Sequence, residues 1–192
     1  MDNILIKTIK SYFDDNQEYD NITILANTSA IINQLFPNIN WVGFYLYKDE
    51  ILKLGPFQGK PACMLIKLEN GVCGWSARNR KSIIVNNVHE FEGHIACDSA
   101  SNSELVVPII IDNHLYGLLD IDSPVYSRFS NEDLLVMEEI ISIISKKIKR
   151  LKWVSFILFI MLQIQLMPLG QSRLYEDLIL KLLCIHHYDH WI

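Results

Sequence analysis

The sequence WVGFYLY at residues 41–47 decides the fold, because its side-chain pattern repeats every two residues. The large aromatic side chains of Trp41 and Tyr45 fall on one side of the chain, as they do in a β-strand. A polar turn at residues 48–50 leads into a second apolar run. We therefore predict a β-hairpin formed by residues 41–47 and 51–57.

Trp41 and Tyr45 share one face of the first predicted strand, and Gly43 leaves space between them. An aromatic slot of this kind can hold a thioether or a cation. The alternative is that both rings pack in an ordinary sheet core. The pattern alone leaves both interpretations open.

A second pair of apolar strands is predicted at residues 105–111 and 115–121, joined by a polar turn. Asp120 and Asp122 lie two residues apart near the end of this pair, so both carboxylates leave the same face. Glu104 enters the partner strand and could approach them. Three crowded carboxyls would repel one another and raise at least one pKa unless a cation binds there. The alternative is that these acids face water at a turn.

Helices are predicted before and after these strands. Apolar residues three or four apart indicate helices over residues 4–13 and 21–36. The sequence SNED at residues 130–133 has the form of a capping box, and it opens an apolar stripe over residues 134–148. That stripe would suit packing on a sheet, on a sister helix or in a homodimer.

Length, charge and cysteine content narrow the class of protein. The chain has 192 residues, 50% of them hydrophobic, which suits one domain and an appendage. The net charge is −5 and the basic residues are scattered, apart from a cluster at residues 146–152, so nothing indicates nucleic-acid binding. No signal peptide is apparent, so we expect a reducing, cytoplasmic setting. There the four cysteines favour chemistry, metal binding or core packing over structural disulfides.

Three cysteines stand in loops or at the start of a helix. Cys97 lies in GHIACDSASNSE, residues 93–104, which has no apolar period and is predicted to be an ordered loop. Such a cysteine is a candidate nucleophile, although most isolated cysteines are buried as small hydrophobes. Cys63 ends a Gly- and Pro-rich stretch at residues 55–63, which we expect to be a loop. Cys73 follows a glycine turn at the start of a short helix, where the helix dipole favours a lowered pKa.

The C-terminal stretch has a different character. Residues 153–169 are almost uniformly apolar and follow the basic cluster. They are marginal as a membrane span, because a bilayer needs roughly 20 apolar residues. We therefore predict a domain at residues 1–150 and an atypical apolar extension of unknown role at residues 151–192, whose contact with a membrane is left open.

Five segments occur in a fixed order along the chain: WVGFY at 41–45, LGPFQGKPAC at 54–63, GVCG at 71–74, HIACDS at 94–99 and LDIDSP at 119–124. Together they resemble the free methionine-(R)-sulfoxide reductases, a catalytic branch of the GAF domains. The resemblance extends from about residue 20 to about residue 148. It implies a GAF-like α+β fold, with an antiparallel sheet of about six strands flanked by helices.

The resemblance also implies a reaction, the reduction of free L-methionine (R)-S-oxide to L-methionine without a cofactor or a metal. Cys97 would attack the sulfoxide sulfur and become a sulfenic acid. Cys63 would resolve that acid as an intramolecular disulfide, and Cys73 would be an auxiliary or alternative thiol. A thioredoxin-like reductant would then reset the enzyme. Trp41 and Tyr45 would cradle the methyl and sulfur end of the substrate.

Glu104, Asp120 and Asp122 would serve the rest of the substrate. A carboxyl group with a raised pKa can protonate the departing oxygen or stabilise positive charge on sulfur. The same acids can hold the ammonium group of a free amino acid. This would account for a substrate that is not part of a protein.

Two other functions remain open from the sequence. A non-catalytic GAF module could bind a small molecule or sense redox state, because a fold does not fix a function. Such a module, however, has no need of three thiols around an acidic pocket. The other candidate is a zinc protein whose ligands would be Cys63, Cys73, His94 and Cys97. Its loop spacings do not match those of common zinc sites.

Overall fold

The computed structural model describes residues 2–14, 17–93 and 99–148. Six strands form one sheet in the order β3-β2-β1-β6-β5-β4, and every neighbouring pair is antiparallel. The strands are β1 (Trp41–Lys48), β2 (Ile51–Gly59), β3 (Leu65–Lys67), β4 (Ile83–Val85), β5 (Ser103–Ile111) and β6 (His114–Ser123). The predicted α+β class and the number of strands are confirmed.

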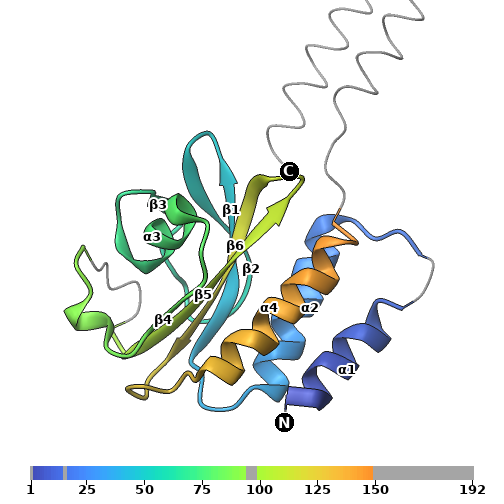
Figure 1. Ribbon diagram of the computed structural model, residues 1–192, viewed down its shortest axis with the longest axis horizontal. Helices are drawn as coiled ribbons and strands as arrows, with labels where there is room; N and C mark the ends of the chain where they lie inside the picture. The colour runs from blue at the N-terminus through green and yellow to red at the C-terminus, as the bar shows by residue number, and fades with distance from the viewer. Residues whose placement is uncertain (1, 15–16, 94–98, 149–192) are drawn as a thin grey trace, which may run out of the picture. The chain divides into compact units, whose positions relative to one another are not determined.

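Helices cover the two faces of the sheet unequally, as Figure 1 shows. The helices are α1 (Asp2–Tyr12), α2 (Asn21–Leu35), α3 (Gly71–Asn79) and α4 (Asn131–Ser145), with a 3₁₀ turn η1 (Val88–Glu90). On one face, α2 packs on β1 and β2, α4 packs on β5, and α1 packs on α2 and α4. On the opposite face, α3 packs on β5 and β6.

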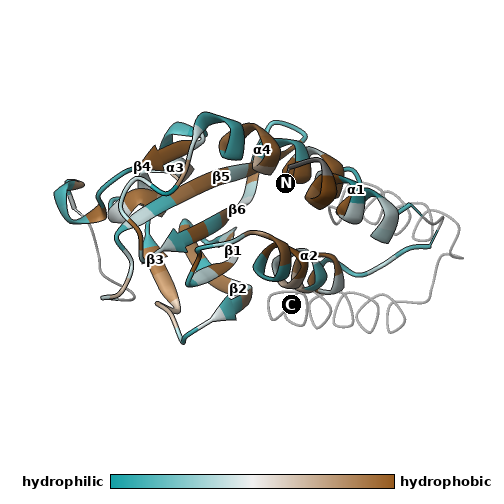
Figure 2. Cartoon of the chain, turned by 90° about the horizontal axis from the view of Figure 1, so that it is seen from below, coloured by the Kyte–Doolittle hydropathy of each residue, from teal (hydrophilic) through white to brown (hydrophobic). Residues whose placement is uncertain are grey.

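The alternation of side chains along β1 divides the core between these two faces. Val42 and Phe44 point into the larger cluster, beneath α1, α2 and α4. Trp41 and Tyr45 point into the smaller cluster, beneath α3. In Figure 2, hydrophobic residues (brown) lie along the strands and along parts of the helices. The period of two in the sequence therefore assigns each residue of β1 to one of two separate cores.

Two tight turns fix the register of the sheet. Asp49 and Glu50 have φ values of 55° and 61°, and Asp112 and Asn113 have φ values of 50° and 62°. Two consecutive residues with positive φ form the two-residue hairpin turn whose twist matches that of its strands. Because a slip of one residue would reverse every side chain, these turns determine which face the residues of β1 and β6 occupy.

The strand β2 is longer than predicted. The second strand of the hairpin was predicted at residues 51–57 and a loop at residues 55–63, but the strand continues to Gly59. In its ladder with β1, Gly43 pairs with Phe57 and Trp41 with Gly59. The register shifts between Gly43 and Tyr45. A bulge of this kind lets a strand contain a glycine and a proline that a regular ladder would exclude.

The start of α4 follows the predicted capping box. The Ser130 hydroxyl accepts from the Asp133 N–H, and the Asp133 carboxylate accepts from the Ser130 N–H. The apolar stripe is buried against the rest of the domain, through Met137, Ile141 and Ile144 among others. The stripe therefore packs within the domain, and a homodimer stays a prediction.

No helix in residues 2–14, 17–93 or 99–148 is long and apolar enough to cross a membrane. The predicted apolar segment at residues 153–169 lies outside the described residues, as does the rest of the extension at 151–192.

Candidate active site

The predicted acidic patch is formed by adjacent strands. Asp122 of β6 pairs with Trp41 of β1 on one side and with Glu104 of β5 on the other. Asp120, two residues earlier, pairs with Gly43. Directly paired residues of antiparallel strands share a face, so these side chains leave the sheet together. The convergence that the spacing predicted is confirmed.

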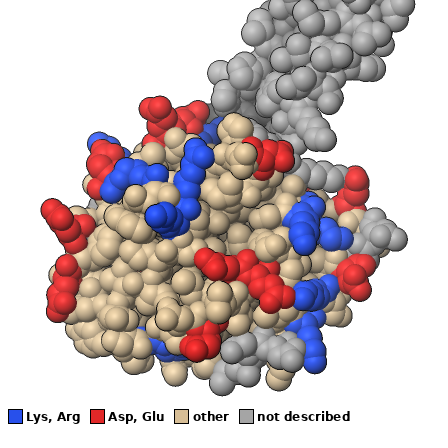
Figure 3. All heavy atoms as spheres, viewed as in Figure 1, with Lys and Arg blue, Asp and Glu red and all other residues tan. Residues whose placement is uncertain are grey.

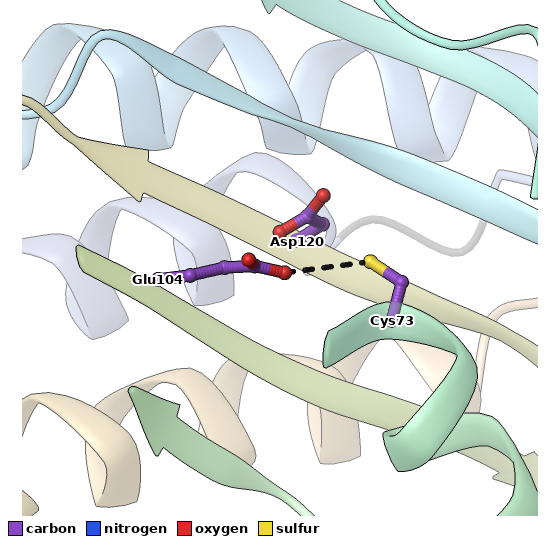
Figure 4. A group of neighbouring side chains, drawn as sticks. All are labelled: Cys73, Glu104 and Asp120. Carbon is purple, nitrogen blue, oxygen red and sulfur yellow. Dashed lines mark hydrogen bonds between the residues drawn. The ribbon is translucent and has the colours of Figure 1, made fainter. Parts of the chain in front are cut away.

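Cys73 completes a buried cluster with two of these acids (Figure 4). Its Sγ lies 3.7 Å from Oε1 of Glu104, to which it donates a hydrogen bond. One ligand atom each from Cys73, Glu104 and Asp120 lies within 4.8 Å of the others. Their exposed fractions are only 4%, 7% and 6%, and Asp122 beside them is half-buried. The alternative that these acids face water is therefore wrong for Glu104 and Asp120.

Burial raises the pKa of both buried carboxyls. The pKa of Glu104 lies well above its usual value, first because the group is desolvated and then because of the charges of Asp120 and Asp122. Burial raises the pKa of Asp120 to about 6, although contacts with Cys73 and Glu104 act in the opposite direction. The sequence predicted a raised pKa from crowding, whereas the larger cause is loss of water. The raised pKa makes Glu104 a candidate proton donor.

The prediction of a lowered pKa for Cys73 is wrong. Cys73 lies in the first turn of α3, but burial raises the pKa of its thiol well above the usual value, and the charges of Asp120 and Glu104 raise it further. Desolvation and two neighbouring acids outweigh a helix dipole, whose effect is confined to a short range. Cys73 is thus a protonated hydrogen-bond donor, and it is poorly suited to be a nucleophile at neutral pH.

Aromatic rings occupy the sheet face beside the acids. Trp41 stacks on Tyr45, with ring centroids 5.9 Å apart, and on Phe57 of β2, at 5.4 Å. A Cβ added at Gly43 would lie 2.5 Å from the Trp41 ring and 2.4 Å from Cβ of Phe57. The space at Gly43 is therefore filled by these side chains and does not form an open slot. Phe57 was not predicted to belong to this stack, although it lies in the predicted hairpin, where it pairs with Gly43.

Two hydrogen bonds connect this aromatic stack to the segment that carries Cys63. The Tyr45 hydroxyl donates to the carbonyl oxygen of Cys63 at 3.0 Å, and Nε1 of Trp41 donates to the carbonyl oxygen of Lys60 at 3.1 Å. Burial raises the pKa of Tyr45, which keeps its hydroxyl a donor. Cys63 is in a disulfide bond, whereas Cys73 is a free thiol. Cys97 lies outside the described residues.

The surface differs from this site in its distribution of charge. On the face shown in Figure 3, acidic and basic side chains are interspersed. Glu104 and Asp120, in contrast, have no basic partner among the described residues within hydrogen-bonding distance. Buried carboxyls without a cation are expensive to maintain. The site is therefore suited to a ligand that carries a positive charge or that shares a proton with a carboxylate.

Comparison with known proteins agrees with this fold. The family model described as the GAF domain matches residues 23–148. Free methionine-R-sulfoxide reductase of Escherichia coli is 46% identical over 125 residues, which are 65% of this chain and 76% of the relative. The solved fRMsr of Staphylococcus aureus, in complex with substrate, is 45% identical with a TM-score of 0.73, and the match covers 77% of this chain and 95% of that one.

A third comparison is a free methionine-R-sulfoxide reductase of Neisseria meningitidis, solved in complex with its substrate. It is 37% identical, with a TM-score of 0.72, and the match covers 76% of this chain and 87% of that one. The fold is thus that of a GAF-domain protein. Within that class, the chain belongs to the free methionine-R-sulfoxide reductase family.

Proposed function

We propose that this chain reduces free L-methionine (R)-S-oxide to L-methionine, with residues 1–150 carrying the activity. The observation that carries the proposal is the two-part sheet face, on which Glu104 and Asp120 adjoin the stacked rings of Trp41 and Tyr45. The acids suit the ammonium group of an amino acid, and the rings suit a methyl group on sulfur. Membership of the reductase family supports this assignment.

The first chemical step uses Cys97 as nucleophile. Its thiolate bonds to the sulfoxide sulfur, and the S–O bond of the substrate breaks as the protonated oxygen transfers to the Cys97 sulfur. The new S–S bond then breaks, methionine leaves with its electron pair, and Cys97 becomes a sulfenic acid. A proton is needed at the departing oxygen, and Glu104 is suited to supply it because its pKa is raised. Asp120 and Asp122 would hold the ammonium group.

The second step returns the thiol to its reduced state. The Cys63 thiolate attacks the sulfenic sulfur of Cys97, a disulfide forms, and the hydroxide that leaves takes up a proton to become water. The disulfide observed at Cys63 supports this role, since Cys73 is free. A thioredoxin-like dithiol would then reduce the disulfide in a reducing, cytoplasmic compartment. Cys73, protonated and bonded to Glu104, would help to position that carboxyl.

The proposal is tested by offering the purified chain three substrates in separate reactions: free L-methionine-(R)-sulfoxide, the S epimer and a peptide-bound sulfoxide. Dithiothreitol or thioredoxin supplies electrons, and released methionine is quantified. We expect turnover of the free R epimer alone. The acids need a free ammonium group, which excludes the peptide, and membership of the family implies the R epimer. Turnover of the peptide-bound sulfoxide would contradict the proposed role of the acids. No turnover by folded, reduced protein would favour a ligand-binding module.

Tyr45→Phe should slow the second step and leave the first unchanged. Phenylalanine keeps the ring that stacks on Trp41 but removes the hydrogen bond to the Cys63 carbonyl, worth about 1 kcal/mol. We expect the rate of disulfide formation to fall roughly fivefold, with an unchanged initial release of methionine. Rapid quenching with a sulfenic-acid probe measures both steps. Tyr12→Phe, at an exposed residue of α1, is the control, and equal slowing in both variants would contradict the positioning role.

A further inference from the structure

Cys73, Glu104 and Asp120, to which the proposed reaction gives separate roles, also form a compact set of three donor atoms. Their side chains come from α3, β5 and β6, and they converge on one buried point (Figure 4). Three regular elements, packed on one another, hold the three donor atoms within 4.8 Å. Zn²⁺ binds both Cys sulfur and carboxylate oxygen, so a preorganised set of one sulfur and two carboxylate oxygens offers three ligands of suitable kinds.

The distances between the donor atoms are close to those expected for ligands of a single ion. At ordinary zinc–ligand bond lengths, a sulfur and an oxygen bound to one tetrahedral ion lie about 3.6 Å apart. Sγ of Cys73 and Oε1 of Glu104 are 3.7 Å apart. Only a small adjustment of Asp120 would be needed to place the third ligand, since its oxygen is already within 4.8 Å of both.

A second observation is the state of Asp120 itself. Its Oδ1 is buried and has no hydrogen-bond partner in the described part of the chain. The residue is only 6% exposed, and its carboxyl group lies beside the other two donors in Figure 4. A buried oxygen without a partner costs free energy, which a bound cation would recover.

We infer that Cys73, Glu104 and Asp120 form a binding site for a thiophilic divalent cation of the Zn²⁺ type in the reduced protein. On binding, the ion displaces the proton of the Cys73 thiol into solvent. The thiolate sulfur so formed favours Zn²⁺ or Co²⁺ over Mg²⁺ and Ca²⁺, which take six or more oxygen ligands. Three protein ligands leave a fourth position open. A bound ion would occupy the place that we assign to the substrate's ammonium group, so Zn²⁺ is expected to inhibit. Only this last consequence rests on the proposed function.

The test uses the full chain with Cys63→Ser and Cys97→Ser, which removes both thiols of the proposed reaction. Co²⁺ is added under anaerobic, reducing-agent-free conditions, and absorbance follows the thiolate-to-cobalt charge-transfer band. We expect one equivalent of Co²⁺ to give this band, and excess Zn²⁺ to abolish it by displacement. Because this background is inactive by design, the result does not depend on whether the proposed reaction is correct.

Single substitutions in that background identify the ligands. We expect Cys73→Ser to abolish the band, and Glu104→Gln to weaken Co²⁺ binding at least about tenfold, since one ligand is lost. Cys184→Ser is the matched control and should change neither. Circular dichroism verifies that each variant folds. A band that is absent, that survives Cys73→Ser, or that is unaffected by Glu104→Gln in folded protein would overturn the inference.

Discussion

Cys97→Ser should abolish multiple turnover of free methionine sulfoxide, whereas Cys63→Ser should release about one methionine per enzyme and then stop. A serine hydroxyl does not form the nucleophilic anion at neutral pH, so we expect a loss of at least about 10³-fold, as for other nucleophiles that are removed. Without Cys63, the sulfenic acid at Cys97 can form but cannot be resolved. Quenched-flow measurement of methionine per enzyme separates the two outcomes.

The controls for this pair are chemical as well as genetic. A sulfenic-acid probe should label the Cys63→Ser variant after one turnover and leave the Cys97→Ser variant unlabelled. Cys184→Ser should behave as the unaltered chain. Full multiple turnover by Cys97→Ser would show that another group attacks sulfur. Sustained turnover by Cys63→Ser with dithiothreitol excluded and thioredoxin as the sole reductant would show that Cys63 does not resolve the intermediate.

Asp120→Asn should reduce activity and increase stability at neutral pH. The carboxylate is proposed to hold the substrate's ammonium group, and loss of a buried charged partner costs about 2–5 kcal/mol of binding. We expect kcat/KM to fall on the order of 10²-fold, mainly through KM. Steady-state kinetics with the free sulfoxide measures this change. Asp112→Asn, at an exposed turn residue, is the control.

The stability effect has a defined dependence on pH. Asp120 has a pKa of about 6 in the folded chain and 3.8 in the reference state, so the folded state retains a proton that the unfolded state has released. The free energy of unfolding therefore falls as pH rises from about 4 to about 6, and it stays lower above that range. The loss is about 1–3 kcal/mol.

Asp120→Asn removes this titration. Denaturant titrations at a series of pH values should give nearly equal free energies of unfolding for the variant and the unaltered chain at pH 4. The variant should be more stable by about 1–3 kcal/mol at pH 7. Parallel curves with no widening gap would contradict the assignment of a raised pKa to Asp120. Binding sites commonly lower the stability of a fold, because they place charge where a ligand will bind.

The sequence was informative wherever a local rule decides the structure. The period of two at residues 41–47 was sufficient for β1, and the capping box at Ser130 and Asp133 was sufficient for the start of α4. The spacing of Asp120 and Asp122 correctly placed both on one face. The prediction of a loop at residues 55–63 failed over residues 55–59, where pairing with β1 overrides the turn-forming tendency of Gly55 and Pro56.

The chemistry of the site depended on contacts that are distant in sequence. Cys73 and Glu104 are separated by 31 positions, and no local pattern indicates that they touch. The helix dipole predicted the wrong direction for the Cys73 pKa, because desolvation is a property of the folded core and cannot be read from neighbours in the chain. Phe57 is part of the aromatic stack because the register of the hairpin pairs it with Gly43.

By itself, the sequence determined the strands, the capped helix, the family and the candidate groups for the reaction, because these follow from short-range spacing and from motifs. Only the tertiary structure decided that α3 places Cys73 on the acids, that Glu104 and Asp120 are buried, and that Tyr45 bonds to the Cys63 segment. The physical reason is that proton affinity depends on the solvent and charge around a group. Those surroundings are assembled from strands and helices that are distant in sequence.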